Sequence, residues 1–367
     1  MTDIGIGMIG GGYMGKAHSA AFAAVGTIFE TSLKPRLEVI CSASAERAEG
    51  YRQAYGYRRS TGDWRALVND PAVDAVVIAA PQSFHRPIAE AAFAAGKHVL
   101  CEKPLGASIK DALAMVKAAE SSGLIHQTAF CYVRSPATQF ARKLLTEKAI
   151  GDVTWFRAEH TEDFLADANE PWQWRCTGAA NGTLGDLAVH LFNGALALMG
   201  PIDSLIAETE TIHKERPGGI VDNDDQVHLM CRFQSGVMGH LHSSRVATGR
   251  KMGYAYEIHG TKGAIRFDQE DQNAMWLYRM EGPEAERGFR KILTGPAHPD
   301  YKAFCLGPGH GTGYNDLIVI EAKDFLEAIA SGTPRFPTFR DGLAAARIVE
   351  AATKSNASRS WQSVIQD

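Results

Sequence analysis

Three ionisable side chains have contexts that suit acid–base chemistry on an alcohol, and the first is Lys103. It follows a β-branched run that ends in Glu102, and it precedes Pro104. The carboxyl ends of parallel strands line the ligand crevice of a sheet, so a lysine there can orient a hydroxyl, stabilise charge on its oxygen or relay a proton. Taken by itself, Lys103 is equally compatible with a surface lysine before a proline turn.

Asp186 and His190 are the other two. Residues 185–190 are predicted to be helical, and the i, i+4 spacing places both side chains on one face. Imidazole, whose ordinary pKa is about 6.5, can accept an alcohol proton at neutral pH while hydride leaves the same carbon. Asp186 can bind the substrate or tune the basicity of His190 and Lys103. The alternative, a capping aspartate and a core histidine, is favoured when the pair is considered alone.

A glycine loop near the N-terminus predicts a dinucleotide site. Residues 10–15 read Gly-Gly-Gly-Tyr-Met-Gly and match G-x-G-x-x-G between a predicted strand and a predicted helix. Gly10 permits the tight turn, Gly12 lets the backbone approach a pyrophosphate, and Gly15 allows the helix to pack closely. Tyr13 and Met14, which occupy the variable positions, are assigned to the cofactor site with the glycines.

The end of the second predicted strand bears on which nicotinamide cofactor binds. An NAD site usually has an acid there for the ribose 2′-hydroxyl, whereas this chain has Ser42 and Ser44, with Arg47 one helical turn beyond. A guanidinium pairs with a 2′-phosphate and a carboxylate repels it, so the pattern favours NADP over NAD. The alternative is a solvated Arg47 in a pocket that tolerates NAD.

The first third of the chain alternates short β-branched runs with alanine-rich helical stretches, which is typical of a parallel sheet covered by helices. We therefore predict a Rossmann-type domain at residues 1–130. Ser44, Asp63 and Ser108 are suitable helix caps. The predicted strands are 4–9, 37–41, 75–79, 98–101 and 125–130, and the predicted helices are 15–25, 45–55, 64–69, 85–95 and 108–122.

Residues 131–367 have a different pattern. Longer alternating runs at 227–233 and 236–243, joined by glycine and asparagine turns, predict an α+β domain with a large, mostly antiparallel sheet. Helices are predicted at 315–330 and 341–355. The exposed face of such a sheet favours a homo-oligomer.

Composition narrows the function. The 367 residues carry a net charge of −4, which makes nucleic acid an unlikely partner. The six dispersed cysteines and the absence of a signal peptide predict reduced thiols in the cytoplasm. The apolar stretch 184–199 is too short and polar to span a membrane. His240 and His242 share a strand face but lack a third ligand, so no metal site is predicted.

The glycine loop, Glu102-Lys103-Pro104 and Gly185-Asp186-x-x-x-His190, in this order, resemble the Gfo/Idh/MocA oxidoreductases, which include glucose–fructose oxidoreductase and inositol dehydrogenase. The resemblance spans nearly the whole chain. It implies that Lys103, Asp186 and His190 are the catalytic set and that the protein forms homodimers or homotetramers. Segments 172–175, 249–251 and 307–310 also resemble the branch that contains levoglucosan-type sugar dehydrogenases.

Further cofactor and substrate residues are assigned within this resemblance. The cofactor contacts assigned are Pro81, Gln82, His85, Glu102, Lys103, Trp174 and Arg175. The substrate contacts assigned are Lys103, Tyr132, Arg134, Asp186, His190 and His310. Aromatic ring faces pack on the C–H faces of sugars, and guanidinium groups donate hydrogen bonds to hydroxyls. Trp174 and Arg175 are therefore candidates for the sugar pocket as well. Ala188-Val189 departs from the Gly-Ser or Gly-x that many relatives have before the histidine, which affects pocket shape and leaves the chemistry in place.

The sequence thus predicts an NAD(P)-dependent oxidoreductase that moves a hydride between nicotinamide and a secondary hydroxyl of a sugar, anhydrosugar or inositol. Two alternatives keep the same fold. One is a non-catalytic regulator that senses NAD(P), against which Lys103, Asp186 and His190 argue. The other is an NAD-dependent glycoside hydrolase, in which hydride leaves and returns within one cycle and no reduced cofactor accumulates.

Overall fold

The structure is a computed structural model that describes residues 2–365. The chain divides into two compact units, residues 1–134 with 313–343 and residues 135–312 with 344–367. The first unit therefore contains residues 313–343, which the predicted division at residue 130 assigned to the second domain. The physical reason is that the helix at residues 314–331 packs against the first unit.

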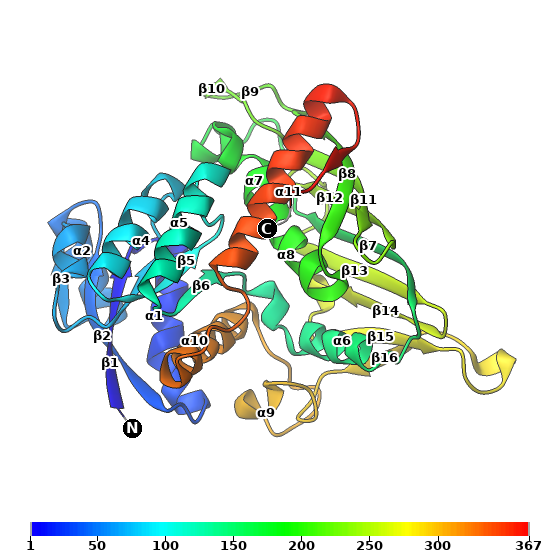
Figure 1. Cartoon of the computed structure of the whole chain (residues 1–367), viewed down its shortest axis with the longest axis horizontal. Helices are drawn as coiled ribbons and strands as arrows, with labels where there is room; N and C mark the ends of the chain where they lie inside the picture. The colour runs from blue at the N-terminus through cyan, green and yellow to red at the C-terminus, as the bar shows by residue number, and fades with distance from the viewer. Residues whose placement is uncertain (1, 366–367) are drawn as a thin grey trace. The chain divides into compact units, whose positions relative to one another are not determined.

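A six-stranded parallel sheet forms the centre of the first unit (Figure 1). Its strand order, 3-2-1-4-5-6, is that of a doubly wound dinucleotide-binding fold, which confirms the predicted Rossmann-type sheet. The strands in sheet order are β3 (Arg59–Thr61), β2 (Leu33–Cys41), β1 (Thr2–Ile9), β4 (Ala75–Ile78), β5 (His98–Glu102) and β6 (His126–Ala129). The central strands are buried on both faces, which explains their continuous apolar runs.

Six helices of the first unit accompany these strands, and three of them have the predicted caps. Ser44, Asp63 and Ser108 each accept a hydrogen bond from a first-turn amide. The helices are α1 (Tyr13–Ile28), α2 (Ala45–Tyr55), α3 (Trp64–Val68), α4 (His85–Ala94), α5 (Ile109–Ser122) and α10 (Tyr314–Ser331). Short 3₁₀ turns are η1 (Gln82–Phe84) and η2 (Tyr132–Arg134).

Helix α10 packs beside α1, although the two are far apart in the sequence (Figure 1). Phe22 and Phe325 meet edge to face, with ring centroids 6.5 Å apart. Residues 317–322 of α10 are buried without a break, so the helix is covered on several faces. This burial places residues 313–343 in the first unit.

A nine-stranded sheet dominates the second unit. All its neighbouring strands are antiparallel except β7 and β12, which are parallel, so the prediction of a mostly antiparallel sheet is confirmed. In sheet order the strands are β16 (Arg290–Leu293), β15 (Ala274–Arg279), β14 (Gly263–Asp268), β13 (Gly253–Gly260), β7 (Val153–Thr161), β12 (Met238–Ser244), β11 (Gln226–Phe233), β8 (Ile202–Glu210) and β17 (Gln362–Ser363). A separate hairpin pairs β9 (Glu215–Arg216) with β10 (Gly219–Ile220).

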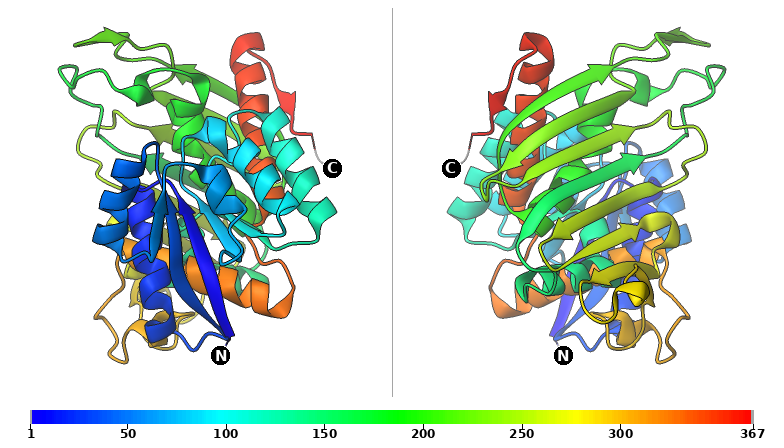
Figure 2. Two further views of the ribbon diagram at one scale, coloured as in Figure 1. Left: turned by 90° about the vertical axis from the view of Figure 1, so that its left-hand side faces the viewer. Right: turned by 90° about the vertical axis from the view of Figure 1, so that its right-hand side faces the viewer.

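One face of this sheet is covered within its own unit and the other is open. Burial alternates strictly along β11, as expected of a sheet with one buried face. The right-hand view of Figure 2 looks onto the strands of the open face. The helices of the unit are α6 (Pro136–Thr146), α7 (Thr183–Asp186), α8 (Ala188–Met199), α9 (Tyr301–Phe304) and most of α11 (Phe339–Ser358), with the 3₁₀ turns η3 (Trp174–Cys176) and η4 (Ala179–Asn181).

Within residues 2–365 the structure contains neither a membrane-spanning helix nor a cluster of metal ligands. None of the helices there combines the length and apolarity needed to cross a lipid bilayer. Within the same residues, no group of three or more histidine, cysteine, aspartate or glutamate side chains is arranged to hold a metal ion.

Candidate active site

The glycine loop lies between β1 and α1 and has the geometry of a phosphate cradle. Gly10 has a φ of +103°, and a Cβ there would clash with the carbonyl oxygen of Ala79 at the end of β4. A Cβ on Gly15 would clash with the carbonyl oxygen of Gly10, whereas Gly12 faces open space. The loop therefore fits a dinucleotide pyrophosphate beside the N-terminus of α1.

The two variable residues of this loop have different surroundings. Tyr13 is 71% exposed, so it can cover a bound cofactor. The Met14 sulfur lies 3.8 Å from the Tyr314 hydroxyl of α10. Tyr314 in turn lies beside Tyr132, with ring centroids 6.0 Å apart. Met14 therefore links the glycine loop to α10 rather than lying in open space.

The end of β2 carries the residues that would select the cofactor. The Ser44 hydroxyl caps α2 by accepting the Arg47 amide at 3.3 Å, and the Arg47 side chain is exposed. Asp63 belongs to the neighbouring loop, and its charge helps to raise the pKa of Cys41, after burial, to about 11. An acid that the sequence reasoning missed thus lies near this strand end, although it comes from the loop that follows β3.

Lys103 leaves the sheet directly after β5, at the carboxyl edge where the fold binds its ligands. Its backbone N–H donates to Glu102 Oε2 at 3.2 Å. The Glu102 carboxylate also accepts from His18 Nε2 through Oε1 at 2.8 Å, and it is only 6% exposed. Glu102 therefore supports Lys103 from within the protein, and its contact with a cofactor stays a prediction.

His85, the other buried residue assigned to the cofactor, also has partners within the protein, and its contact with a cofactor stays a prediction. Its ring is 1% exposed, and its two nitrogens lie 3.0 Å from the Pro104 carbonyl oxygen and 2.8 Å from that of Ala80. Burial lowers the pKa of His85, and the two carbonyls oppose that effect. The ring joins the end of β4 to the turn at Lys103, whereas Pro81 is exposed and Gln82 half-buried at the start of η1.

Tyr132 and Arg134, which were assigned to the substrate, are both buried in the first unit. Arg134 forms an ion pair with Asp324 of α10. This pair attaches η2 to α10, so it gives Arg134 a structural role within the unit that the sequence pattern did not indicate.

Asp186 and His190 lie in the second unit, and the predicted single helix is wrong. Asp186 ends α7, His190 is in the first turn of α8, and Leu187 separates the two helices. The His190 N–H donates to the Leu187 carbonyl oxygen at 3.1 Å, an i−3 bond typical of a tightened turn. The i, i+4 argument for a shared helix face therefore does not apply, although both residues are buried.

Small and aromatic residues set the position of His190. A Cβ on Gly194, one turn further along α8, would clash with the Tyr254 hydroxyl of β13, so glycine allows the helix to approach the sheet. The His160 ring on β7 lies 5.7 Å from the His190 ring. Its Nδ1 is 3.0 Å from the Leu187 carbonyl oxygen and its Nε2 is 3.0 Å from Glu162. His160 has no motif around it, and the sequence reasoning missed it.

Trp174 and Arg175 form η3 near Asp186. The Arg175 guanidinium lies 4.1 Å from the Trp174 ring centroid, and its Nε is 3.3 Å from Asp186 Oδ2. Trp174 is half exposed. The second unit thus joins an aromatic face, a guanidinium and a carboxylate, a combination that suits polyhydroxylated ligands.

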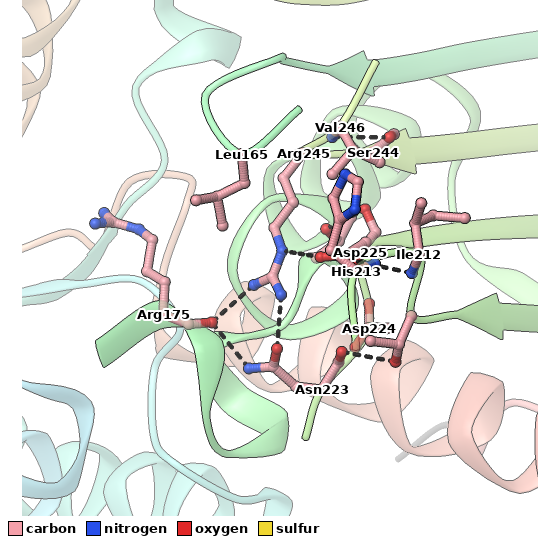
Figure 3. A network of polar contacts seen from close by, with 12 residues as sticks. Leu165, Arg175, Ile212, His213, Asn223, Asp224, Asp225, Ser244, Arg245 and Val246 are labelled. Carbon is pink, nitrogen blue, oxygen red and sulfur yellow. Dashed lines mark hydrogen bonds and ion pairs between the residues drawn. The ribbon is translucent and has the colours of Figure 1, made fainter. Parts of the chain in front are cut away.

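A buried ion pair holds this region in place (Figure 3). Arg245 Nε donates to Asp225 Oδ1 at 2.8 Å, and both side chains are almost fully buried. The same guanidinium donates to the carbonyl oxygens of Arg175 and Asn181 at 2.7 and 3.1 Å. Asn223 adds a bond to the Arg175 carbonyl oxygen at 3.0 Å. No sequence motif marks Arg245 or Asp225, which come together only through the fold.

His310 lies in the loop after α9. Its Nδ1 is 2.9 Å from the sulfur of Cys305, and Gly307 packs against its ring. Tyr301, which is fully buried, bonds the carbonyl oxygen of Gly307 and the amide of Gly311. The loop is therefore a defined structure within the second unit, and its contact with a sugar stays a prediction.

The histidines of β12 share one strand face, as predicted, and this is the open face of the nine-stranded sheet. His242 stacks on His228 of β11, with ring centroids 4.2 Å apart. Burial and the neighbouring imidazoles lower the pKa of His242 to about 4. Imidazoles packed in this way form part of the sheet surface.

A doubly wound sheet with a glycine cradle, an edge lysine and a second α+β unit defines a dinucleotide-binding oxidoreductase. The chain belongs to the Gfo/Idh/MocA family. The family model described as "Oxidoreductase family, NAD-binding Rossmann fold" matches residues 4–130, and the GFO/IDH/MocA C-terminal domain matches residues 138–266. The predicted family is thereby confirmed.

Individual relatives agree along the whole chain. Levoglucosan dehydrogenase of Pseudarthrobacter phenanthrenivorans is 38% identical over 100% of this chain and 99% of its own. Inositol 2-dehydrogenase of Rhizobium meliloti is 25% identical over 96% and 97%. A solved levoglucosan dehydrogenase in complex with NADH and levoglucosan has a TM-score of 0.97 at 39% identity, with 100% of both chains covered.

Proposed function

We propose that this protein oxidises a secondary hydroxyl of a sugar, anhydrosugar or inositol, with a levoglucosan-like anhydrosugar as the leading candidate. The observation that carries the proposal is full-length similarity to levoglucosan dehydrogenase. Lys103 at the sheet edge and Asp186 with His190 in the second unit supply the side chains that such a reaction needs.

Each residue of the set has a definite role in this proposal. His190 accepts the proton of the hydroxyl that is oxidised, and Lys103 holds and polarises its oxygen. Asp186, paired with Arg175, binds a neighbouring hydroxyl and maintains the basicity of the imidazole. A nicotinamide held by the Gly10–Gly15 cradle supplies the hydride acceptor when it is bound.

For the cofactor, we propose NADP as the better of the two nicotinamide dinucleotides. Ser42 and Ser44 at the end of β2 leave room for a 2′-phosphate, and the exposed Arg47 can pair with it. Two observations favour NAD instead: Asp63 lies near the same strand end, and solved relatives were obtained with NADH. Replacement of Arg47 by alanine separates the two proposals, because it lowers kcat/KM for NADP only if Arg47 binds the 2′-phosphate.

A substrate panel tests the activity. The purified protein is mixed with NAD or NADP and with levoglucosan, other anhydrosugars, pyranoses and inositols, and reduced-nicotinamide absorbance is followed. We expect reduction with one sugar class. If the cofactor binds and no sugar gives reduction, the NAD(P)-sensing regulator becomes the better hypothesis. Turnover of a glycoside without accumulation of reduced cofactor would instead indicate the hydrolase.

We also propose that the protein is a cytoplasmic homodimer or homotetramer that associates through the open face of the nine-stranded sheet. Trp155, Met230 and Met238 are exposed on neighbouring strands. The register pairs Met238 with Trp155 and Met230 with His240, so these side chains share that face. All six cysteines are free thiols, which supports a reducing compartment.

A further inference from the structure

A chain of buried polar groups lies behind Lys103. His18 is on the second turn of α1 and is fully buried, and its Nε2 lies 2.8 Å from Glu102 Oε1. The other carboxylate oxygen of Glu102 accepts the Lys103 backbone N–H at 3.2 Å. Glu102 is thus held from one side by an imidazole and holds on its other side the main chain from which Lys103 extends.

Helix α10 contributes a second acid to this group. Two contacts show that α1 and α10 run side by side in the same direction: Met14 with Tyr314 at 3.8 Å, and Phe22 with Phe325 at a ring distance of 6.5 Å. His18 lies between Met14 and Phe22 on α1, and Glu321 lies between Tyr314 and Phe325 on α10. The Phe22 and Phe325 contact fixes the helices one turn away from the two titratable groups.

The Glu321 carboxylate is an unusual group in a protein interior. It is 1% exposed, and neither oxygen has a hydrogen-bond partner within residues 2–365. The His18 Nδ1 atom has no such partner there either. A native protein seldom buries an ionisable group unpaired without a functional reason, because its desolvation is costly.

The charges around Glu321 have opposing effects on its pKa. Burial raises its pKa to about 7, against the attraction of His18 and Arg134 and with the repulsion of Glu102 and Asp324. Burial opposes charge on His18, but Glu102 and Glu321 outweigh it and raise the His18 pKa. These groups come from α1, β5, η2 and α10, the elements packed around the cluster.

We propose that His18 and Glu321 are positioning residues for Lys103, acting through Glu102. The inference rests on the proposed function for the catalytic meaning of Lys103. His18 fixes one carboxylate oxygen of Glu102 so that the other holds the Lys103 main chain at the sheet edge. When Glu321 is ionised, its charge favours the protonated imidazole, which makes that bond a charge-assisted one.

The test follows the Lys103 backbone amide directly. The full-length protein is labelled with ¹⁵N-lysine, and the Lys103 resonance is assigned by its loss in Lys103→Arg. We expect His18→Leu to move this resonance and to lower kcat about tenfold or more, with cofactor affinity nearly unchanged. His18→Gln keeps an N–H donor, so both the Lys103 amide resonance and kcat should be close to those of the wild-type protein. In Glu321→Gln this resonance shifts at a lower pH than in the wild-type protein, because the charge that favours protonated His18 is lost.

Phe22→Leu is the matched control. It weakens the same α1 and α10 contact without touching Glu102, so it lowers stability and leaves the Lys103 amide and kcat unchanged. The proposal is overturned if His18→Leu leaves the amide resonance in place, or if Phe22→Leu moves it equally. Should His18→Leu fail to fold, Glu321→Gln, which keeps the shape of the side chain, decides by its pH profile. If the wild-type protein oxidises no sugar, the proposed function fails, and the amide measurement still decides the role of His18.

Discussion

Lys103 begins a turn whose main chain is held on both sides. Its own N–H donates to Glu102, and the carbonyl oxygen of the next residue, Pro104, lies 3.0 Å from the His85 ring. Such support matters because a catalytic ammonium must meet a substrate oxygen with little positional error. The lysine is therefore attached to a rigid part of the sheet edge.

Replacement of Lys103 or His190 by alanine is expected to remove turnover and to leave cofactor binding nearly intact. Loss of the proton acceptor or of the group that holds the oxygen lowers kcat by about 10²- to 10⁴-fold. The measurement pairs steady-state kinetics with cofactor titration by fluorescence. Full activity in either variant would contradict the assigned roles.

At the scale of residues, sequence motifs within one short segment could be predicted. Contacts between side chains that are far apart in the sequence could not. The glycine loop has the predicted shape because a Cβ on Gly15 would meet the Gly10 carbonyl oxygen within the same loop, and a Cβ on Gly10 would meet the main chain of Ala79 after the neighbouring strand β4. The buried partners of His85 and Glu102 could not be predicted, since a place in a motif does not reveal whether a side chain points inward. His18 and Glu321 are brought together only by helix packing.

At the scale of the elements, the packing of α10 against α1 buries Glu321 and so makes the free energy of unfolding depend on pH. The folded-state pKa of Glu321 is about 7, above its ordinary value of 4.5, so between these values the folded chain keeps a proton that the unfolded chain releases. The free energy of unfolding therefore falls as pH rises through this window, by on the order of 3 kcal/mol. His18, with its raised pKa, adds a loss of the same sign at higher pH.

Glu321→Gln removes the Glu321 part of this dependence. We expect the variant to gain stability relative to the wild-type protein as pH rises from about 5 to about 8. Urea denaturation at both pH values measures the difference. An equal stability difference at the two pH values would show that Glu321 is ionised in the folded state throughout.

The loop that carries Arg175 and Asn181 depends on the ion pair of Arg245 with Asp225. Asp225→Asn leaves a buried guanidinium without its counter-charge, and we expect a loss of about 3–5 kcal/mol in the free energy of unfolding. The exposed pair of Lys148 with Asp152 provides the control, since Asp152→Asn should cost less than about 1 kcal/mol. Equal effects of the two substitutions, measured by urea denaturation, would refute a supporting role for the pair.

Strands and caps were largely predictable, and two helical features were not. Alternation along β11 and β12 predicts their faces correctly, because burial on one side imposes a period of two. The break at Leu187 has no signal, since leucine favours helix on both sides of it. The place of α10 was open because its apolar residues can pack on either sheet.

At the scale of the whole molecule, we predict that the protein forms a homodimer or homotetramer through the open face of the nine-stranded sheet. Trp155→Glu or Met230→Glu places a charge within the proposed interface and should shift the protein from a dimer or tetramer towards the monomer. Light scattering after gel filtration measures the mass. Ile220→Glu changes a more exposed apolar residue, in the β9–β10 hairpin, and should have no effect. A wild-type monomer would rule out the interface.

Hydride transfer from a sugar carbon is the central claim, and isotope tracing tests it most directly. A sugar that supports reduction is prepared with deuterium at each ring carbon in turn, and the mass of the reduced cofactor is measured. We expect deuterium from one carbon to appear on the nicotinamide and the same carbon to become a ketone. Reduced cofactor without deuterium from any position, or bound cofactor that every sugar leaves oxidised, would contradict it.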